Sequence, residues 1–564
     1  MKNFRLFFVF FFFSLLGFSQ ISKIHYIPPL TANDREQGGA GSIPYGQYLY
    51  LSTPSTQPVS GTITILSTNT KIAFSDLSSS PLSNNNPITY EIVPQSATNP
   101  AAAMNNKLFV DADETANSTG IQVLKAGLLV EADCPIYVSV RYYAGAQSGA
   151  FTTKGVAAMG TEFRTGMMTN GSQSVENTSQ NGSNTHNLNF FSVMATENNT
   201  IVEIELPNAA SILLGGTTNS YSYSGGSKIQ KTLQQYESII LAQDFRNSQN
   251  NGSDRFGLIG ALVKSVDVLG NKDSSKPVVV NTGSASGTFA AATGGHDHGV
   301  DQIVGIDRVG HEYIFVRGDG EDGTQSGGYE LENPLVVAAQ DGTEIYIGSD
   351  TSPTTTLNAG ESLLISSSLY SKQSPGGTMY VKTQNQDFKL FAYQGVGGNG
   401  ASTANQGMFF VPPLNEEAQD DVDNIADIED VGGIAFGGGI SIVTKVSATV
   451  TVSDATGNIT LPSPEAIDGK PEYHAYNIID LQGEVKIECD EDLYVNYYGF
   501  SGSAAIGGFY SGFSIPPNPI IDPSLASLGY CIIEDDSGNF VSSNIELDIQ
   551  NSDLFDGWVW EIYD

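Results

Sequence analysis

Positive charge is what this sequence lacks most. The chain of 564 residues carries 25 Lys and Arg against 61 Asp and Glu, which gives a formal net charge of −36. Proteins that bind duplex nucleic acid need clustered Lys and Arg to neutralise phosphate groups, and anionic lipid demands the same. The sequence contains no basic stripe of this kind, so it argues against nucleic acid and anionic membrane surfaces as partners.

Cysteine is scarce as well. The three cysteines, Cys134, Cys489 and Cys531, are an odd number at wide spacing. This is neither a disulfide framework nor a zinc cluster. One bridge between two of them stays open as an alternative to three buried thiols, because free cysteine commonly packs as a small apolar side chain.

Long hydrophobic runs are absent after the first twenty residues. Lys2 and Arg5 precede a continuous apolar stretch at Leu6–Phe18, and small residues lead up to Ser19. This pattern predicts a secretory signal over residues 1–19 that is cleaved after Ser19. Its apolar core is too short to span a bilayer comfortably. We therefore expect a mature chain without a membrane-spanning segment, secreted or held at the outer cell surface.

The composition that remains is typical of a turn-rich β protein. Glycine occurs 61 times, charged residues make up 15% and aromatic residues 10%. Disordered chains lack aromatic and β-branched residues, so disorder is not indicated. No segment has a convincing helical periodicity of apolar residues. The sequence predicts an all-β fold built from antiparallel strands.

An internal repeat organises the strands. Val300–Gly310 and Val422–Gly432 share the pattern Val-Asp-x-Ile-x-x-Ile-x-x-Val-Gly, and Val193–Ile204 matches Val336–Ile347 as strand, tight turn, strand. Leu124–Leu129 resembles two later turns that begin at Leu233 and Leu357. Apolar closing strands recur at Pro135–Val138, Pro277–Val280, Phe388–Phe391 and Leu493–Val495. These matches predict one repeated region over 20–520, with units of about 24–150, 151–297, 298–408 and 409–520.

Two architectures fit four such units. They could form a β-propeller-like ring, which the similar ends of the repeat region favour, or stand as tandem β-sandwiches. From residue 521 the pattern changes, and Ile545, Leu547 and Ile549 alternate with polar or acidic residues as in a half-buried strand. Residues 521–564 are therefore predicted to begin an Ig-like or PKD-like β-sandwich.

The repeats resemble the IgGFc-binding protein N-terminal domain family. Gly295–Gln302 and Gly310–Tyr313 carry the resemblance, together with the strand–turn–strand pattern and the closing strand Pro277–Val280. The likeness covers roughly 150–510. It implies an exported binding or adhesion protein of the bacterial cell surface or extracellular medium, whose partner is a protein or a glycan. Bacterial members often continue into Ig-like or PKD-like modules, and residues 521–564 resemble the start of such a module.

The cluster whose residue types are best suited to metal binding consists of His296, His298 and Asp301. Residues two apart on a strand share a face, so two imidazoles could ligate Zn²⁺ with the carboxylate as a third ligand. Flanking glycines favour a loop instead, and the family resemblance favours a structural role.

Two acidic groups could bind Ca²⁺, which prefers oxygen ligands in glycine-containing loops. The first is Asp319 with Asp322 and the second is Asp421 with Asp423. Neither has the spacing of the twelve-residue helical calcium loop, and turn capping is the alternative for Asp423. Arg317, with the next two residues, also spells a cell-attachment tripeptide.

No catalytic constellation is visible. The sequence has no Gly-x-Ser-x-Gly nucleophile elbow, no phosphate-binding loop and no pair of carboxylates within a recognisable catalytic motif. We expect no catalytic residues and no cofactor apart from the calcium just described. The leading hypothesis is a non-enzymatic binding protein. A structural spacer within a larger surface protein is the alternative, followed by an extracellular glycan hydrolase, because propellers host such chemistry.

Overall fold

We analysed a computed structural model of the chain. It describes residues 20–32, 44–97, 104–110, 123–145, 147–170, 188–208, 210–213, 220–244, 256–289, 297–318, 329–397, 406–415, 421–502 and 504–513, with short strands at 116–117, 120–121, 533–534 and 540–542. The expected signal sequence lies outside the described residues, as does most of 521–564.

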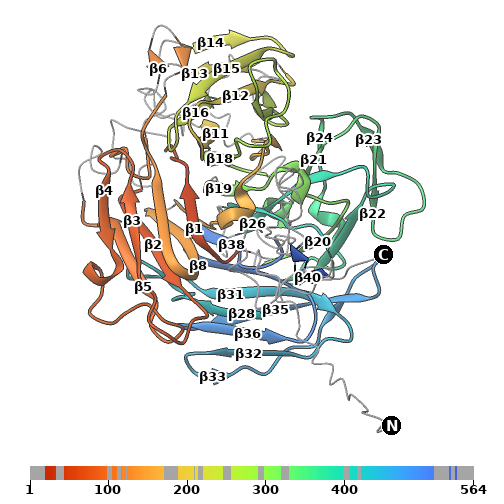
Figure 1. The fold of residues 1–564 in the computed structure, drawn as a ribbon. Helices are drawn as coiled ribbons and strands as arrows, with labels where there is room; N and C mark the ends of the chain where they lie inside the picture. The colour runs from red at the N-terminus through yellow and green to blue at the C-terminus, as the bar shows by residue number, and fades with distance from the viewer. Residues whose placement is uncertain are drawn as a thin grey trace. The chain divides into compact units, whose positions relative to one another are not determined.

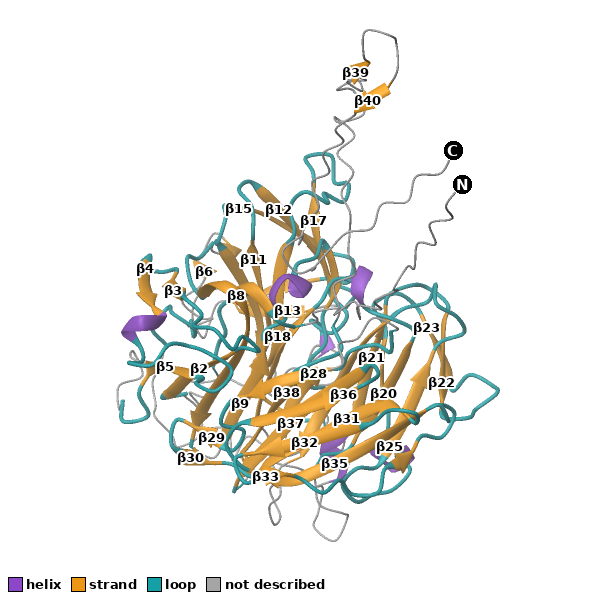
Figure 2. Ribbon diagram, turned by 60° about the horizontal axis from the view of Figure 1, so that its bottom comes forward, coloured by secondary structure: helices purple, strands orange, loops and turns teal. Residues whose placement is uncertain are grey.

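The predicted all-β, antiparallel class is confirmed. Strands are the main regular structure of the described part of the chain, and its only helices are short 3₁₀ turns (Figure 2). These turns are η1 (Phe74–Asp76), η2 (Gly155–Ala158), η4 (Ile306–Arg308), η5 (Tyr329–Glu332) and η6 (Ser367–Leu369). Within the described ranges, no helix has the length and apolar character needed to cross a bilayer.

The strands fall into four groups with one topology, which Figure 1 colours in chain order from red to blue. When the eight main strands of a group are numbered along the chain, one sheet has the order 1-6-3-4 and the other has the order 5-2-7-8. We call each group a sandwich and name its sheets by these orders. All four sandwiches belong to one compact unit, Ser19–Ser514.

The bounds of the eight strands are as follows. In the first sandwich they are β1 (Ser22–Ile27), β2 (Gly46–Ser52), β3 (Gly61–Ile65), β4 (Thr70–Ala73), β5 (Ile88–Val93), the two halves of β8 (Leu128–Ala144) and β9 (Gln147–Thr152). In the second they are β10 (Glu162–Arg164), β11 (Leu188–Ala195), β12 (Thr200–Glu205), β15 (Lys228–Leu233), β16 (Ser238–Asp244), β17 (Leu262–Val266), β18 (Val278–Gly287) and β19 (Asp297–Ile303). In the third they are β20 (Glu312–Val316), β21 (Pro334–Ala338), β22 (Thr343–Ile347), β23 (Thr355–Leu357), β24 (Ser362–Leu364), β25 (Thr378–Lys382), β26 (Leu390–Gly397) and β27 (Gln406–Phe410). In the fourth they are β28 (Asp421–Ile425), β31 (Gly438–Lys445), β32 (Val450–Asp454), β33 (Gly457–Asn458), β35 (Tyr473–Leu481), β36 (Val485–Cys489), β37 (Leu493–Ser501) and β38 (Ala504–Phe509).

Short additional strands decorate this plan. They are β6 (Ala116–Asn117), β7 (Gly120–Ile121), β13 (Ala210–Leu213), β14 (Ser220–Tyr223), β29 (Asp430–Val431), β30 (Ile434–Ala435) and β34 (Glu465–Ala466). β13 and β14 extend the 5-2-7-8 sheet of the second sandwich. Outside the sandwiches, β39 (Ile533–Glu534) pairs with β40 (Phe540–Ser542).

The sheets do not confirm the propeller-like ring that the sequence favoured. A propeller blade is a single four-stranded sheet, whereas each repeat here pairs its strands in two different orders. In the first sandwich one long strand, β8, serves both orders, because its first half pairs with β1 and β3 and its second half with β2 and β9. Each repeat therefore has the two sheets of a β-sandwich, as in the alternative, but the four sandwiches do not simply stand in a row, because the fourth also contacts the first.

The repeat itself is real, but two of its sequence matches are wrong, and the first joins Val300–Gly310 to Val422–Gly432. Val300–Ile303 lies on the eighth strand of the second sandwich, whereas Val422–Ile425 forms the first strand of the fourth. Asp301 is fully buried, and Asp423 is half-buried. The two segments matched because alternating apolar residues fit any strand with one buried face. By contrast, the four apolar closing strands do occupy one position, the seventh.

The match between Val193–Ile204 and Val336–Ile347 holds, although it is not a hairpin. In both places the chain passes from the second strand to the third, which belong to different sheets, so the turn bridges the sandwich. Asn199 has a φ of 58° and Gly342 a φ of 73°. Both turns therefore need the left-handed conformation that glycine and asparagine adopt most easily. The resemblance of Leu124–Leu129 to the later turns is wrong, because that segment leads into β8 rather than joining strands four and five.

The two sheets of a sandwich differ in burial. Strands of the 1-6-3-4 sheets alternate, as in β15 and β36, while β2, β11, β21 and β26 of the 5-2-7-8 sheets are buried along their whole length. A sheet covered on both faces needs apolar residues at every position. The 5-2-7-8 sheets therefore have a second packing partner besides their own sandwich.

That partner is the 1-6-3-4 sheet of the preceding sandwich. Tyr26 and Leu129 of the first sandwich pack with Met194 and Val279 of the second. Ile314 and Tyr380 of the third pack with Val443 and Tyr494 of the fourth. The Tyr393 hydroxyl donates to the Arg164 carbonyl, which joins the third sandwich to the second.

Contacts also lead from the fourth sandwich back to the first. The Tyr50 hydroxyl donates to Asp430 Oδ2 at 2.6 Å, and Ser52 Oγ donates to the Asn424 carbonyl at 2.8 Å. The eighth strands complete the pattern, since β9 contacts β19, β19 contacts β27, β27 contacts β38 and β38 contacts β9. The four eighth strands thus bring all four sandwiches to one place.

Candidate functional site

The cluster predicted from the sequence lies where the eighth strands meet. His298 and Asp301 lie on β19, a fully buried strand rather than the loop that the flanking glycines favoured, and His296 lies outside the described residues. Residues three apart on a strand point to opposite faces, so His298 and Asp301 do not converge. In the part of the chain that the structure describes, no group of three or more His, Cys, Asp and Glu is arranged to hold a metal. The zinc site stays a prediction.

Asp301 is engaged by the protein itself. Lys154, which follows β9, donates through Nζ to Asp301 Oδ1 at 2.6 Å. The backbone N–H groups of Gln302 and Phe410 donate to Oδ1 and Oδ2, each at 2.7 Å. The Lys154 side chain is 0% exposed and that of Asp301 is 1% exposed. Burial lowers the pKa of Lys154 and raises the pKa of Asp301, and their mutual attraction opposes both shifts.

Asp297, at the start of β19, accepts hydrogen bonds from backbone N–H groups of the described residues. Its carboxylate accepts backbone N–H bonds from Ser148 on β9 at 2.7 Å, from His298 at 2.7 Å and from Ala505 on β38 at 3.0 Å. Burial raises the pKa of Asp297 well above its usual range, and the three N–H donors oppose that shift. The side chain therefore joins three strands from three sandwiches.

Arg141 on β8 plays a similar part between the fourth and first sandwiches. Its guanidinium donates to the carbonyls of Ala426, Asp427 and Asp430 at 2.6, 2.5 and 2.9 Å and lies 4.1 Å from the ring centre of Tyr50. Sequence reasoning missed Arg141 and Lys154. A cation within the apolar run of β8 is the signal that could have revealed Arg141, because an arginine in a buried strand needs a partner.

The position of Arg317 does not favour a cell-attachment role for its tripeptide. The side chain is 0% exposed, and its Nε lies 3.2 Å from Oε2 of the equally buried Glu332. A guanidinium group that is buried in this way is not accessible to a binding partner.

The calcium candidates remain predictions. Asp319 and Asp322 lie outside the described residues. Asp421 accepts a hydrogen bond from the Cys489 backbone N–H at 3.2 Å. The pKa of Lys486 is raised mainly by its hydrogen bond to Glu488, and the charges of Asp423 and Asp421 add to this shift. Cys134 and Cys489 are free thiols, and Cys531 lies outside the described residues.

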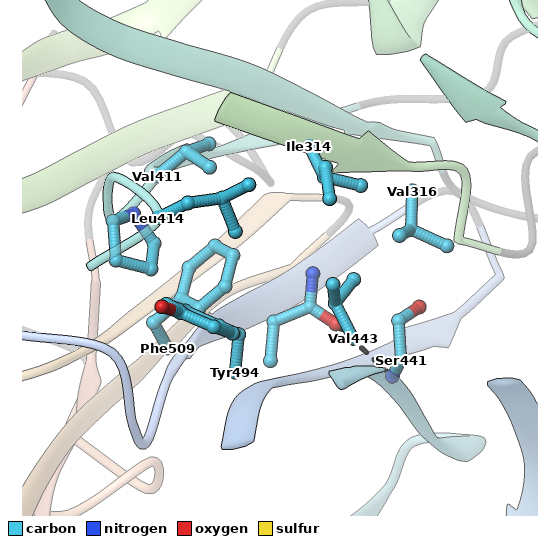
Figure 3. Close-up of a pocket in the computed structure, with 10 residues that line it drawn as sticks. Ile314, Val316, Val411, Leu414, Ser441, Val443, Tyr494 and Phe509 are labelled. Atoms are coloured by element: carbon cyan, nitrogen blue, oxygen red, sulfur yellow. Dashed lines mark hydrogen bonds between the residues drawn. The ribbon is translucent and has the colours of Figure 1, made fainter. Parts of the chain in front are cut away.

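Two hollows differ in their capacity for a ligand. One is a small apolar cavity between the third and fourth sandwiches, lined by Ile314, Val443 and Tyr494 among others (Figure 3). Its space of about 10 Å³ suits one water molecule. The other is an open groove of about 560 Å³ on the 1-6-3-4 sheet of the third sandwich. Its lining consists of polar and charged residues: His311, Glu312, Tyr346, Ser349, Asp350, Thr351, Lys382, Thr383, Gln384 and Asn385.

One of the lining residues, Glu312, is held by hydrogen bonds. Glu312 accepts hydrogen bonds from the Tyr380 hydroxyl and, at 3.0 and 3.1 Å, from Lys470 of the fourth sandwich. Burial alone would raise the pKa of Glu312, but these donors outweigh it and hold the pKa below its usual range. Glu312 is thus a fixed negative charge beside the half-buried Lys382 and Tyr346.

Fold and site together define a class of protein built from repeated β-sandwiches. Buried charged side chains join the repeats, and a polar groove lies on the surface of the third sandwich. A family model described as IgGFc binding protein matches residues 149–499, which is more than half of the chain. The chain belongs to this family, as its resemblance had indicated, and this is a binding family rather than an enzyme family. No curated protein matches the chain.

Proposed function

We propose that this chain is an exported, non-enzymatic binding protein that attaches to a protein or glycan at a cell or extracellular surface. The observation that carries the proposal is the family match, which runs from the last strand of the first sandwich into the fourth and includes the whole polar groove. The groove volume lies in the range usual for ligand sites. Hydroxyl, amide, carboxylate and ammonium groups converge there, which suits a polar partner.

Export is supported by the position of Gln20. The predicted cleavage after Ser19 would leave Gln20 as the first residue of the mature chain. Its side chain is buried, and Nε2 donates to the Phe509 carbonyl at 2.6 Å, so the fold takes up the chain from this residue onward. N-terminal sequencing of secreted protein tests this step. An intact Met1 in the cell fraction would contradict export.

Binding is tested on the intact secreted chain by biolayer interferometry against immobilised immunoglobulin Fc fragment and a panel of extracellular glycans. We expect retention of at least one class of ligand, weakened at least tenfold by Lys382→Ala in the groove. Lys228→Ala is the matched control, because Lys228 is an exposed lysine on the 1-6-3-4 sheet of the second sandwich. Turnover of a glycan without retention would contradict the proposal and favour the hydrolase alternative.

The structural spacer is the second candidate. The packing of each sandwich on the next supports it, because the four repeats are joined through buried contacts such as those of Arg141. A folded chain that binds nothing in the panel would favour this function.

A further inference from the structure

Lys154 and Asp301 form an amine–carboxyl contact from which water is excluded. The 2.6 Å distance joins Nζ to Oδ1, and both side chains are at most 1% exposed. The rings of Phe410 and Phe513 lie with their centres 5.9 and 5.1 Å from Nζ. Among the described residues, two aromatic rings and the Asp301 carboxyl group therefore lie around Nζ.

Such surroundings favour the uncharged forms of both groups. Taking two ions out of water is costly, and transfer of one proton from the amine to the carboxyl removes both charges. Burial shifts the pKa of Lys154 downward and that of Asp301 upward, which is the direction this transfer requires. A neutral amine is a nucleophile, and a neutral carboxyl group is its electrophilic partner.

The backbone around Asp301 suits the next step. Phe410 N–H donates to Oδ2, so negative charge that develops on this oxygen meets a fixed donor. Oδ1 accepts from Nζ and from Gln302 N–H, which places the oxygen that must leave beside the amine protons. Holding the two groups in contact supplies the proximity that an intermolecular reaction would lack.

We propose that Lys154 and Asp301 condense to an intramolecular amide, an isopeptide bond. The lone pair of Nζ attacks Cγ of Asp301 and forms the C–N bond. The bond from Cγ to Oδ1 breaks, and this oxygen leaves as water with the carboxyl proton and one amine proton. Oδ2 remains as the amide oxygen. The reaction needs no external oxidant, reductant or activating group, and it removes the mass of one water.

The bond would join the first sandwich to the second at the place where Phe410 of the third and Phe513, just after the last strand of the fourth, also pack. Two other pairs in the chain are internal controls. Arg317–Glu332 is equally buried, but a guanidinium stays protonated and cannot attack. Lys228–Glu203 has an amine, but Lys228 is 55% exposed and keeps its charge in water.

Peptide mapping of the intact secreted chain tests the proposal. Trypsin cleaves a chain with a free Lys154 into 142–154 and 155–164, and Asp301 is released in 273–308 because Pro277 protects the bond after Lys276. We expect instead one branched species in which 142–164 is joined to 273–308, lighter by one water than the sum of its parts. Recovery of free 142–154 as the main product from folded protein would overturn the proposal.

Lys154→Arg supplies the matched variant, since it keeps the positive charge but cannot condense. Its digest should contain 273–308 unlinked. The mapping of the unmodified protein decides the question even if this variant fails to fold. Refolding from denaturant adds a kinetic control on newly made chains that have not yet condensed. The branched species should accumulate with a rate independent of protein concentration, and a rate that rises with concentration would show an intermolecular reaction instead.

Discussion

Lys154 and Lys228 each place Nζ within hydrogen-bond distance of an acidic side chain, one where the eighth strands meet and the other on an outer sheet. The Nζ–oxygen distances are similar, 2.6 Å to Asp301 and 2.9 Å to Glu203. Their surroundings are opposite, because the first pair is sealed from water and Lys228 is 55% exposed. Distance alone therefore says little about what an ion pair contributes. Burial decides the cost of breaking it.

The largest effect should come from breaking the buried pair. Asp301→Ala removes the proposed amide and leaves the Lys154 amine without a partner in an apolar place, and we expect a loss of about 3–5 kcal/mol in the free energy of unfolding. Urea denaturation measures it. The double variant Lys154→Met/Asp301→Leu also lacks the amide but buries no unpartnered amine, so it should lose less than Asp301→Ala alone. Equal losses in both variants would show that the unpartnered amine is not what destabilises the protein.

A second test uses pH on a buried group of β1. His25 lies within 2.6 Å of Thr153 Oγ1 and within 3.0 Å of the Ser22 and Ile136 carbonyls, and burial lowers its pKa from 6.5 to about 4. The unfolded chain therefore takes up this proton first as the pH falls. Above pH 6.5 neutral His25 contributes about 2–3 kcal/mol to the free energy of unfolding. This contribution is lost as the pH falls from 6.5 to 4.

Urea denaturation at several pH values checks this expectation. His25→Gln should flatten the dependence between pH 6.5 and 4 relative to the unmodified protein. An equal slope in both proteins would contradict the assignment to His25.

A smaller effect should come from the turns between the second and third strands, at Asn199 and Gly342. Gly342 has a φ of 73°, and a Cβ atom there would meet nothing within 4 Å, so only backbone strain opposes a side chain. Gly342→Val should lower the stability by about 1–2 kcal/mol and reduce the Tm in a thermal scan. Asn199→Gly, at the matching turn, should change the Tm little, because glycine adopts this φ freely. If Gly342→Val kept the Tm but abolished ligand binding, the turn would be a binding loop.

The smallest effect should come from the exposed pair. Lys228→Ala removes an ammonium that water screens, so the Tm should stay within the error of the measurement. A double-mutant cycle with Glu203→Gln measures the coupling directly. A coupling as large as that between Lys154 and Asp301 would show that burial does not decide how strongly these two pairs interact.

The sequence by itself determined the class of fold. Alternating and continuous apolar runs are properties of consecutive residues, so the strands of Val193–Ile204 and the closing strand Pro277–Val280 could be found without a structure. Family membership was also visible, because Gly295–Gln302 and Gly310–Tyr313 are local motifs. The same local signal misled at Val422–Gly432, since a strand pattern does not say which position in a sandwich the strand occupies.

Only the tertiary structure decided what the polar residues do. Asp301 was singled out as a metal ligand, yet its partner Lys154 lies 147 residues earlier, and Arg141 finds its carbonyl partners 285 to 289 residues later. The hydrophobic periodicity and the composition of a segment assign a residue to a strand and to a face of that strand, because both properties depend on neighbours in the chain. Partners of a buried charge depend on which sheets pack together, and that choice is made by the shape and burial of whole surfaces rather than by any short stretch of sequence.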